Sequence, residues 1–260
     1  MLRNLFDASE LRSRKYDTYF EVYERVLGRY AGQGATIVEV GVGDGGSILM
    51  WKKYFRDARV IGVDIDPGAR DLTRFGIEIH VGDQGSDEFW EGFYASVGPI
   101  DVLLDDGGHY QEQQIVTVAH ALRNLRDGGV VFVEDVHTSY LPGFGGPSRH
   151  SFVNFAKHLA DCVNSRGEDI LARGEFRDVV WSIEFYESIV VIHVDRARSR
   201  EPVLIENRGS IRPSLPGEAA AARKPLRFLK RIPVLGSVTA ASLRAWKAFL
   251  RNRRLARYFR

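Results

Sequence analysis

The chain has 260 residues, of which 44% are hydrophobic, and it contains one cysteine, Cys162. This length and hydrophobic content suit one sizeable core with extensions. A lone cysteine excludes a disulfide scaffold and argues against a cysteine-rich zinc cluster. Residues 1–20 lack the apolar core of a signal peptide, and no window offers the roughly 18 apolar residues of a membrane span. We therefore expect a cytoplasmic protein that is not exported.

The charge is distributed unevenly. The chain carries 36 Lys and Arg against 34 Asp and Glu, a net charge of +2. Twelve of the cations and no carboxylate lie in residues 223–260, which leaves 24 cations against 34 carboxylates, a balance of −10, in residues 1–222. An acidic body is therefore followed by a basic tail.

Five short apolar runs, rich in Val and Ile, alternate with segments long enough for crossover helices. The runs are residues 36–41, 58–64, 77–83, 100–106 and 129–135. The predicted helical segments between them are residues 47–55, 68–75, 87–97 and 111–125. Continuous apolar runs are typical of strands that are buried on both faces. The alternation predicts an α/β fold with a doubly wound, mostly parallel sheet.

The second half of the chain adds a helix and a hairpin. Residues 148–164 read as a helix, and residues 179–194 read as two β runs joined by a tight reversal near Tyr186 and Glu187. We therefore predict a Rossmann-like sheet of seven strands that ends in an antiparallel hairpin. The predicted organisation is a helical cap in residues 1–30, the main domain in 31–197, a linker in 198–225 and a basic, amphipathic helical tail in 226–260.

The stretch EVGVGDGGS, residues 39–47, closes the first run and opens the first helix. Gly41, Gly43 and Gly46 match the pattern G-x-G-x-x-G, in which glycines permit a tight turn and a close approach of ligand to backbone. That pattern alone is compatible with dinucleotide binding. However, Glu39 lies two residues before the first glycine, which resembles motif I of the class I S-adenosylmethionine methyltransferases. Ordinary turn glycines are the simplest alternative.

Acids also end the second and third predicted strands. Asp64 stands where either kind of fold places a carboxylate for ribose hydroxyls. Asp83, followed by Gln84, stands where the methyltransferase pattern contacts adenine. The predicted cofactor-binding set is Glu39, Gly41, Gly43, Gly45, Asp64, Asp83, Gln84 and Asp105.

Carboxylates gather at the ends of the fourth and fifth strands, in DDGGH (residues 105–109) and VFVED (residues 131–135). The carboxyl ends of parallel strands form one crevice, so these acids are expected beside the bound cofactor. Asp106, Glu134 and Asp135 would present oxygen ligands to a hard dication such as Mg²⁺. A metal ion would also compensate the repulsion among these like charges.

His109 follows Asp106 by three residues and could approach the same metal-bound substrate. A hydroxyl held by a metal ion becomes more acidic, and a neutral imidazole could accept its proton during methyl transfer. His109 is therefore the predicted general base. A structural role for this histidine, and a strand-capping role for Asp105, are the alternatives.

The motif set is similar to one known family. The motifs are EVGVGDGG, GVDID, VGDQ, DDGGH, VFVED and SIEFYESIVV. Across residues 15–194 they resemble the metal-dependent sugar O-methyltransferases of the mycinamicin and rhamnosyl 2-O-methyltransferase group, whose relatives are often labelled cephalosporin hydroxylase. The resemblance implies S-adenosyl-L-methionine as methyl donor, Mg²⁺ or Mn²⁺ held by Asp106, Glu134 and Asp135, and His109 as base. It also implies a sugar hydroxyl of a glycan, glycolipid or glycosylated metabolite as acceptor.

Other functions stay open. An NAD(P)-dependent oxidoreductase would explain the glycine loop but not the acidic pair, and an iron oxygenase would require two histidines with one carboxylate. A membrane-tethered module that binds the donor without turnover is the non-enzymatic alternative. For residues 226–260 we favour an anionic membrane surface over protein docking, and we favour nucleic acid least. A homo-oligomer is also expected.

Aromatic residues gather at two further places. Tyr16, Tyr19, Phe20 and Tyr23 stand at helical spacings, for which core packing is preferred over a lid on the donor site. His137 and Tyr140 follow the acidic pair and are candidates for shaping the acceptor pocket.

Overall fold

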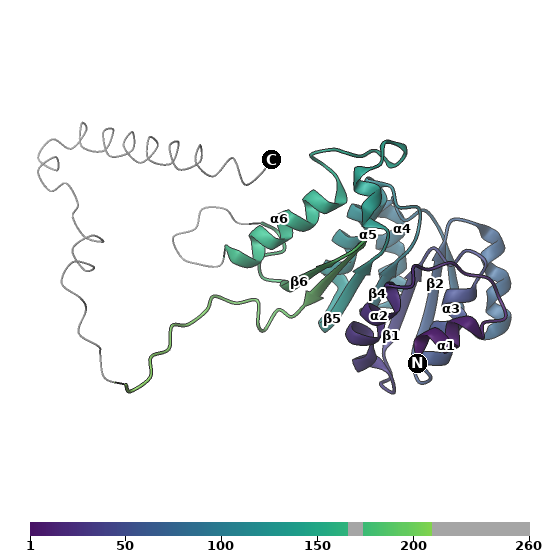
Figure 1. Ribbon diagram of the computed structural model, residues 1–260, viewed down its shortest axis with the longest axis horizontal. Coiled ribbons are helices and arrows are strands. Elements are labelled where there is room, and N and C mark those ends of the chain that lie inside the picture. The colour runs from purple at the N-terminus through teal and green to yellow at the C-terminus, as the bar shows by residue number, and fades with distance from the viewer. Residues whose placement is uncertain (166–173, 210–260) are drawn as a thin grey trace, which may run out of the picture. The chain divides into compact units, whose positions relative to one another are not determined.

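The computed structural model describes residues 1–165 and 174–209 (Figure 1). The chain divides into two units, Met1–Val203 and Leu204–Arg260. Most of the predicted linker and the whole predicted tail, residues 226–260, lie outside the described residues. Within the described part, no helix has the length and apolar character to cross a membrane.

The first unit is built on one mixed sheet of seven strands (Figure 1). The strands are β1 (Thr36–Val40), β2 (Arg59–Asp64), β3 (Glu78–Val81), β4 (Ile100–Asp105), β5 (Leu125–Val133), β6 (Val180–Tyr186) and β7 (Ile189–Val194). Their order is β3-β2-β1-β4-β5-β7-β6. The first five strands run parallel, whereas β7 is antiparallel to both β5 and β6. The predicted fold and its terminal hairpin are confirmed.

Helices connect the strands. The α-helices are α1 (Leu2–Asp7), α2 (Tyr19–Leu27), α3 (Gly46–Tyr54), α4 (Asp87–Val97), α5 (Gln111–Asn124) and α6 (Phe152–Asn164). Residues 1–165 and 174–209 also contain four 3₁₀ segments, η1 (Gly28–Tyr30), η2 (Pro67–Phe75), η3 (Val136–Tyr140) and η4 (Pro142–Phe144). The crossover predicted over residues 68–75 is thus a 3₁₀ segment; Pro67 stands at its start, and the Asp66 side chain accepts a hydrogen bond from the Gly68 amide.

The core lies on both faces of the sheet. Residues of α2 and α3 pack with Ile37 and Val102 on one face. Residues of α4, α5 and α6 pack with Val38 and Leu103 on the other. Successive side chains of a strand point to opposite faces, so burial on both faces explains why these strands are apolar without interruption.

The N-terminal region contributes to both the core and the site. Tyr19, Phe20 and Tyr23 of α2 are buried, as the preferred interpretation of their spacing predicted, whereas Tyr16 is 57% exposed. The segment between α1 and α2 leads away from this core and lines the main pocket through residues 12–16.

Candidate active site

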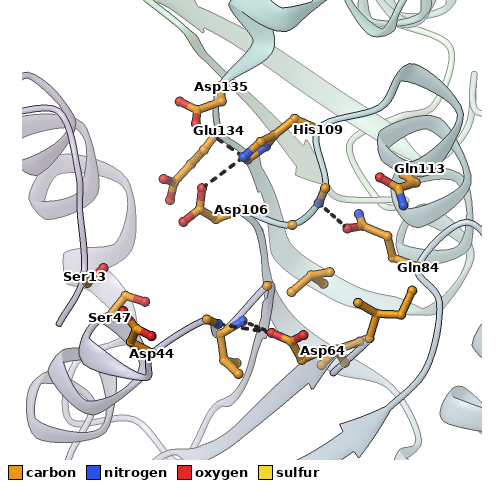
Figure 2. Close-up of a pocket in the computed structure, with 18 of the residues that line it drawn as sticks. Ser13, Asp44, Ser47, Asp64, Gln84, Asp106, His109, Gln113, Glu134 and Asp135 are labelled. Carbon is orange, nitrogen blue, oxygen red and sulfur yellow. Dashed lines mark hydrogen bonds and ion pairs between the residues drawn. The ribbon is translucent and has the colours of Figure 1, made fainter. Parts of the chain in front are cut away.

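A pocket of about 830 Å³ opens at the carboxyl ends of the parallel strands (Figure 2). This volume lies within the range of about 300–1,000 Å³ that is usual for ligand sites. The strand order reverses between β1 and β4, and this switch point is where open α/β sheets bind ligands. Nine predicted site residues line the pocket: Gly41, Gly43, Asp64, Asp83, Gln84, Asp106, His109, Glu134 and Asp135. The predicted residues Glu39, Gly45 and Asp105 do not line it.

Gly41 sits at the point where the glycine loop meets the end of β4. Its φ is +81°, and a Cβ atom built on it would lie 2.3 Å from the backbone oxygen of Asp106. The Gly41 amide also donates to the carbonyl of Val63, at 2.8 Å. A side chain at this position would therefore push the glycine loop away from the acidic turn.

At Gly46, the backbone of the N-terminal segment leaves no room for a side chain. A Cβ atom on Gly46 would lie 2.4 Å from the carbonyl oxygen of Leu11, and its amide donates to the carbonyl of Arg12, at 3.1 Å. The Ser9 hydroxyl donates to the Gly46 carbonyl, at 3.0 Å. The third glycine of the G-x-G-x-x-G match is therefore explained by packing of the N-terminal segment against the start of α3.

Asp64 shapes the glycine loop directly. Its Oδ2 accepts the amides of Val42 and Gly43, at 3.0 and 3.1 Å, and its Oδ1 accepts the Asp66 amide, at 2.9 Å. The carboxylate also faces the pocket (Figure 2). Asp64 thus holds the loop in shape and remains available to ligand hydroxyls at the same place.

Gln84 and Asp105 connect β3 to the acidic turn. The Gln84 side-chain amide donates to Asp105 Oδ1, at 3.0 Å, and its Oε1 accepts the Gly108 amide, at 2.9 Å. Asp105 is fully buried, and its Oδ1 also accepts the Gly107 amide, at 3.2 Å. Asp105, predicted to contact the cofactor, therefore lies beneath the pocket and orders the turn. These contacts support the alternative, a structural role for Asp105 at the end of the strand.

Replacing Asp105 with asparagine should remove a pH dependence from the stability of the fold. Burial raises the pKa of Asp105 from 3.8 to about 6. Because the folded state binds the Asp105 proton more tightly than the unfolded state, this group stabilises the fold fully below about pH 4. As the pH rises from about 4 to above 6, about 3 kcal/mol of the free energy of unfolding is lost. Asparagine keeps the Oδ1 acceptor for both of its partners. In urea unfolding with a chelator present, we expect wild type to lose this free energy between pH 4 and 7 relative to Asp105→Asn; parallel curves would contradict the assignment.

Glu39 and Gly45 lie behind the pocket. Glu39 is buried on β1 and accepts a hydrogen bond from the indole of Trp51, at 3.1 Å, while burial raises its pKa to about 7. Gly45, with φ of +94°, is the residue that precedes the first turn of α3. Both residues support the glycine loop from outside the pocket.

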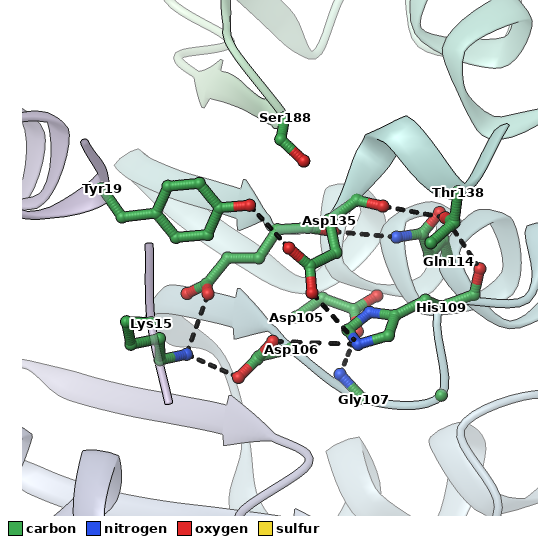
Figure 3. Close-up of polar contacts among 12 residues, drawn as sticks. Lys15, Tyr19, Asp105, Asp106, Gly107, His109, Gln114, Asp135, Thr138 and Ser188 are labelled. Carbon is green, nitrogen blue, oxygen red and sulfur yellow. Dashed lines mark hydrogen bonds and ion pairs between the residues drawn. The ribbon is translucent and has the colours of Figure 1, made fainter. Parts of the chain in front are cut away.

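His109 lies between two carboxylates at the mouth of the site (Figure 3). Its Nε2 is 3.5 Å from Asp135 Oδ2 and 3.9 Å from Asp106 Oδ1. Ligand atoms of these three residues all lie within 4.8 Å of one another, in a group of partly buried side chains. The adjacency predicted for Asp106, His109 and Asp135 is therefore present in the structure.

This group fits a hard dication. Asp106 Oδ2 accepts from Lys15 and Asp135 Oδ1 accepts from Tyr19, at 2.5 and 2.6 Å. Their other oxygens, Asp106 Oδ1 and Asp135 Oδ2, face the His109 ring instead. Two convergent carboxylate oxygens with room for water are the donors that Mg²⁺ prefers.

Glu134, the third predicted ligand, is held differently. Its Oε2 accepts from the Lys15 ammonium, at 2.8 Å, and its Oε1 accepts from the Tyr23 hydroxyl, at 2.6 Å. The Glu134 side chain is buried and is not part of the group of ligand atoms within 4.8 Å. Burial raises the pKa of Glu134, and the charge of Lys15 opposes this rise.

Sequence reasoning missed the role of Lys15. This lysine is 91 residues from Asp106 and 119 from Glu134, and nothing in the local sequence marks it as different from a surface cation. The hydroxyls of Tyr19 and Tyr23 were likewise treated only as parts of an aromatic core face. Their spacing predicted burial correctly, but it carried no information about the acids that their hydroxyls would meet.

Backbone strain also gathers here. In the described part of the chain, the non-glycine residues with positive φ are His109, Asp135 and Ser188, at 58°, 53° and 60°. Ser188 accepts the Val136 amide with its carbonyl, beside Asp135. Left-handed conformations of such residues cost free energy and concentrate at functional sites. The side chains of two of these residues, His109 and Asp135, approach to 3.5 Å.

Comparison with known proteins agrees with this geometry. Residues 38–136 match the model of a methyltransferase domain. The chain is 34% identical over 154 residues to the 8-demethyl-8-alpha-L-rhamnosyl tetracenomycin-C 2'-O-methyltransferase of Streptomyces olivaceus, across 55% of this chain and 40% of the relative. It is 35% identical over 155 residues to the mycinamicin VI 2''-O-methyltransferase of Micromonospora griseorubida, across 54% of this chain and 38% of the relative. The chain thus spans well under half the length of these relatives.

Solved structures show the same fold. The MycE methyltransferase of the mycinamycin biosynthetic pathway, in complex with Mg and SAH, superposes with a TM-score of 0.64 at 26% identity, across 68% of this chain and 48% of that chain. A second crystal form gives a TM-score of 0.71 at 23% identity, across 85% and 60%. The chain therefore has the Rossmann-like fold of the class I methyltransferases, and residues 38–136 within it match a methyltransferase domain.

Proposed function

We propose that the protein is an S-adenosyl-L-methionine- and Mg²⁺-dependent O-methyltransferase that acts on a sugar hydroxyl. The observation that carries this proposal is the arrangement of Asp106, His109 and Asp135, within 4.8 Å of one another, at the mouth of a pocket lined by a glycine loop. The names of the relatives support a sugar acceptor, and the Mg and SAH bound in the MycE structures support the two cofactors.

The residues divide the work of the reaction. When bound, the donor supplies a methyl group on a sulfonium, and a dication acidifies an acceptor hydroxyl. The glycine loop and Asp64 would hold the donor, while Asp106, Asp135 and Glu134 would hold the dication and thereby orient the acceptor. His109 Nε2 would accept the proton of the acceptor hydroxyl during methyl transfer. Most of the rate enhancement then comes from positioning and from removal of this proton.

The rim of the site is aromatic. Tyr16, which lines the pocket, and Tyr110, which follows His109 in the chain, are 57% and 52% exposed. The Tyr110 ring lies 5.5 Å from Phe144, whose ring lies 6.4 Å from His109. Aromatic faces next to a polar cluster suit a sugar, which presents C–H groups on one side and hydroxyls on its edge. This rim supports a glycoside as the acceptor.

The alternatives are less well supported. The glycine match that favoured NAD(P) includes Gly46, whose lack of a side chain is already explained by contact with Leu11 and Arg12. The proposal extends to a cytoplasmic enzyme, expected to be a homo-oligomer, whose residues 226–260 bind an anionic membrane near a glycolipid acceptor. That tail lies outside the described residues, so its basic composition alone supports this extension.

Calorimetry tests the proposed cofactor class. We would titrate S-adenosylmethionine into the full chain with Mg²⁺ and with chelator, and then titrate NAD under the same conditions. We expect binding of S-adenosylmethionine in the micromolar range and no heat from NAD. Binding of NAD alone would overturn the proposal. Donor binding without methylation of any of a panel of glycosides would favour the non-catalytic module.

A further inference from the structure

Lys15 is a buried cation inside the acidic cluster (Figure 3). Its side chain is 1% exposed, and its ammonium lies 2.5 Å from Asp106 Oδ2 and 2.8 Å from Glu134 Oε2. Burial alone would lower the pKa of Lys15, but the charges of Asp106 and Glu134 hold it above its ordinary value. Lys15 therefore places a positive charge between two carboxylates of the site.

Both carboxylates that Lys15 holds are ones that the proposed dication would use. Asp106 belongs to the group of convergent ligand atoms, and Glu134 follows it on the neighbouring strand end. Both oxygens of Glu134 already accept a hydrogen bond within the protein: Oε1 from the Tyr23 hydroxyl and Oε2 from the Lys15 ammonium. A dication that recruits Glu134 must therefore share this oxygen with Lys15 or displace it.

We propose that Lys15 is an internal competitor of the dication for Asp106 and Glu134, and thereby sets the metal affinity of the site. This inference rests on the proposed function and deepens it. A charge of +1 a few ångströms from a dication is strongly repelled at the effective dielectric constant of a partly buried site. Metal entry would then favour movement of the ammonium away from at least one of its two partners.

Movement of the Lys15 ammonium would also affect the chain segment to which Lys15 belongs. Lys15 belongs to the segment, residues 12–16, that lines the pocket beside the glycine loop. That segment is anchored to the start of α3 through the Gly46 amide and the Arg12 carbonyl, and the Lys15 ammonium is its anchor on the acidic side. Release of Lys15 would remove this ion pair, whereas the hydrogen bond between Gly46 and Arg12 does not involve Lys15.

Metal affinity is the measurement that tests this inference. Mn²⁺ would be titrated into the full chain at fixed pH without donor or acceptor, with free Mn²⁺ followed by electron paramagnetic resonance. The variant is Lys15→Met, which keeps the aliphatic length and removes the charge. Lys53→Met is the matched control, because Lys53 lies on α3, outside the residues that line the pocket. Wild-type binding alone tests the proposed metal site, and the difference between the proteins tests the competition.

We expect Lys15→Met to bind Mn²⁺ at least about tenfold more tightly than wild type, and Lys53→Met to change the affinity less than about twofold. Binding by Lys15→Met but not by wild type would support the same conclusion. Unchanged or weaker binding by Lys15→Met would overturn it, since Lys15 would then be a spectator or a support of the ligands. Absence of binding in both proteins would overturn the metal site as well.

A second measurement needs no variant. Wild-type protein would be acylated briefly with acetic anhydride, with and without Mg²⁺, and the modification of Lys15 followed by mass spectrometry against that of Lys53. Because Lys15 is 1% exposed in its ion pairs, displacement should raise its modification severalfold with Mg²⁺. Equal modification with and without Mg²⁺, when Mn²⁺ binding is intact, would contradict displacement even if Lys15→Met failed to fold.

Discussion

Replacement of His109 by asparagine is expected to lower turnover by about 10²–10⁴-fold, the usual contribution of a positioned general base. Asparagine has no basic nitrogen, and it tolerates the left-handed backbone that His109 adopts, with φ of 58°. The affinity for S-adenosylmethionine should change less than about twofold, because the ring faces Asp106 and Asp135 rather than the glycine loop. Single-turnover methylation and calorimetry on the same preparation would measure the two quantities.

A matched histidine serves as the control. His120 is buried on α5 and pairs with Asp87, at 2.7 Å, outside the residues that line the pocket. His120→Asn should retain turnover if it folds. If His109→Asn lost donor affinity and turnover equally, or retained full turnover, His109 would not be the base.

Alanine at Gly41 is expected to have the largest effect on the fold and on the donor together. A methyl group at φ of +81°, 2.3 Å from the Asp106 carbonyl oxygen, must displace backbone, because no flexible side chain can move aside. Backbone strain of this kind lowers the free energy of unfolding by about 2–4 kcal/mol. Donor affinity should fall as well, since the same movement separates the glycine loop from the acidic turn. Chemical denaturation and calorimetry would show both losses.

Gly76 provides the comparison. Its φ of +72° and ψ of +28° lie in the left-handed helical region, and a Cβ atom there would meet nothing within 4 Å. Gly76→Ala should therefore cost only the conformational penalty, about 1 kcal/mol, and leave donor affinity unchanged. Equal destabilisation by the two substitutions would show that φ, rather than contact with Asp106, governs the position.

The sequence by itself determined the sheet and the location of the site. Continuous apolar runs separated by helical segments require strands buried on both faces, and the crossovers make those strands parallel. Once the strands are parallel, their carboxyl ends lie along one crevice. The sequence alone therefore assigns Asp64, Asp106 and Asp135 to one pocket, and the pocket contains all three.

Only the tertiary structure decided which acids face the ligand and what balances their charge. Asp105 and Asp106 are adjacent in sequence, yet the turn that follows β4 buries the first against Gln84 and leaves the second in the pocket. The partner of Asp106 and Glu134 is Lys15, about a hundred residues away in the chain. Ion pairs of this kind form only when segments that are distant in the sequence pack together, and local composition does not predict that packing. The sequence could therefore predict a need for positive charge at the site, but not which residue would supply it.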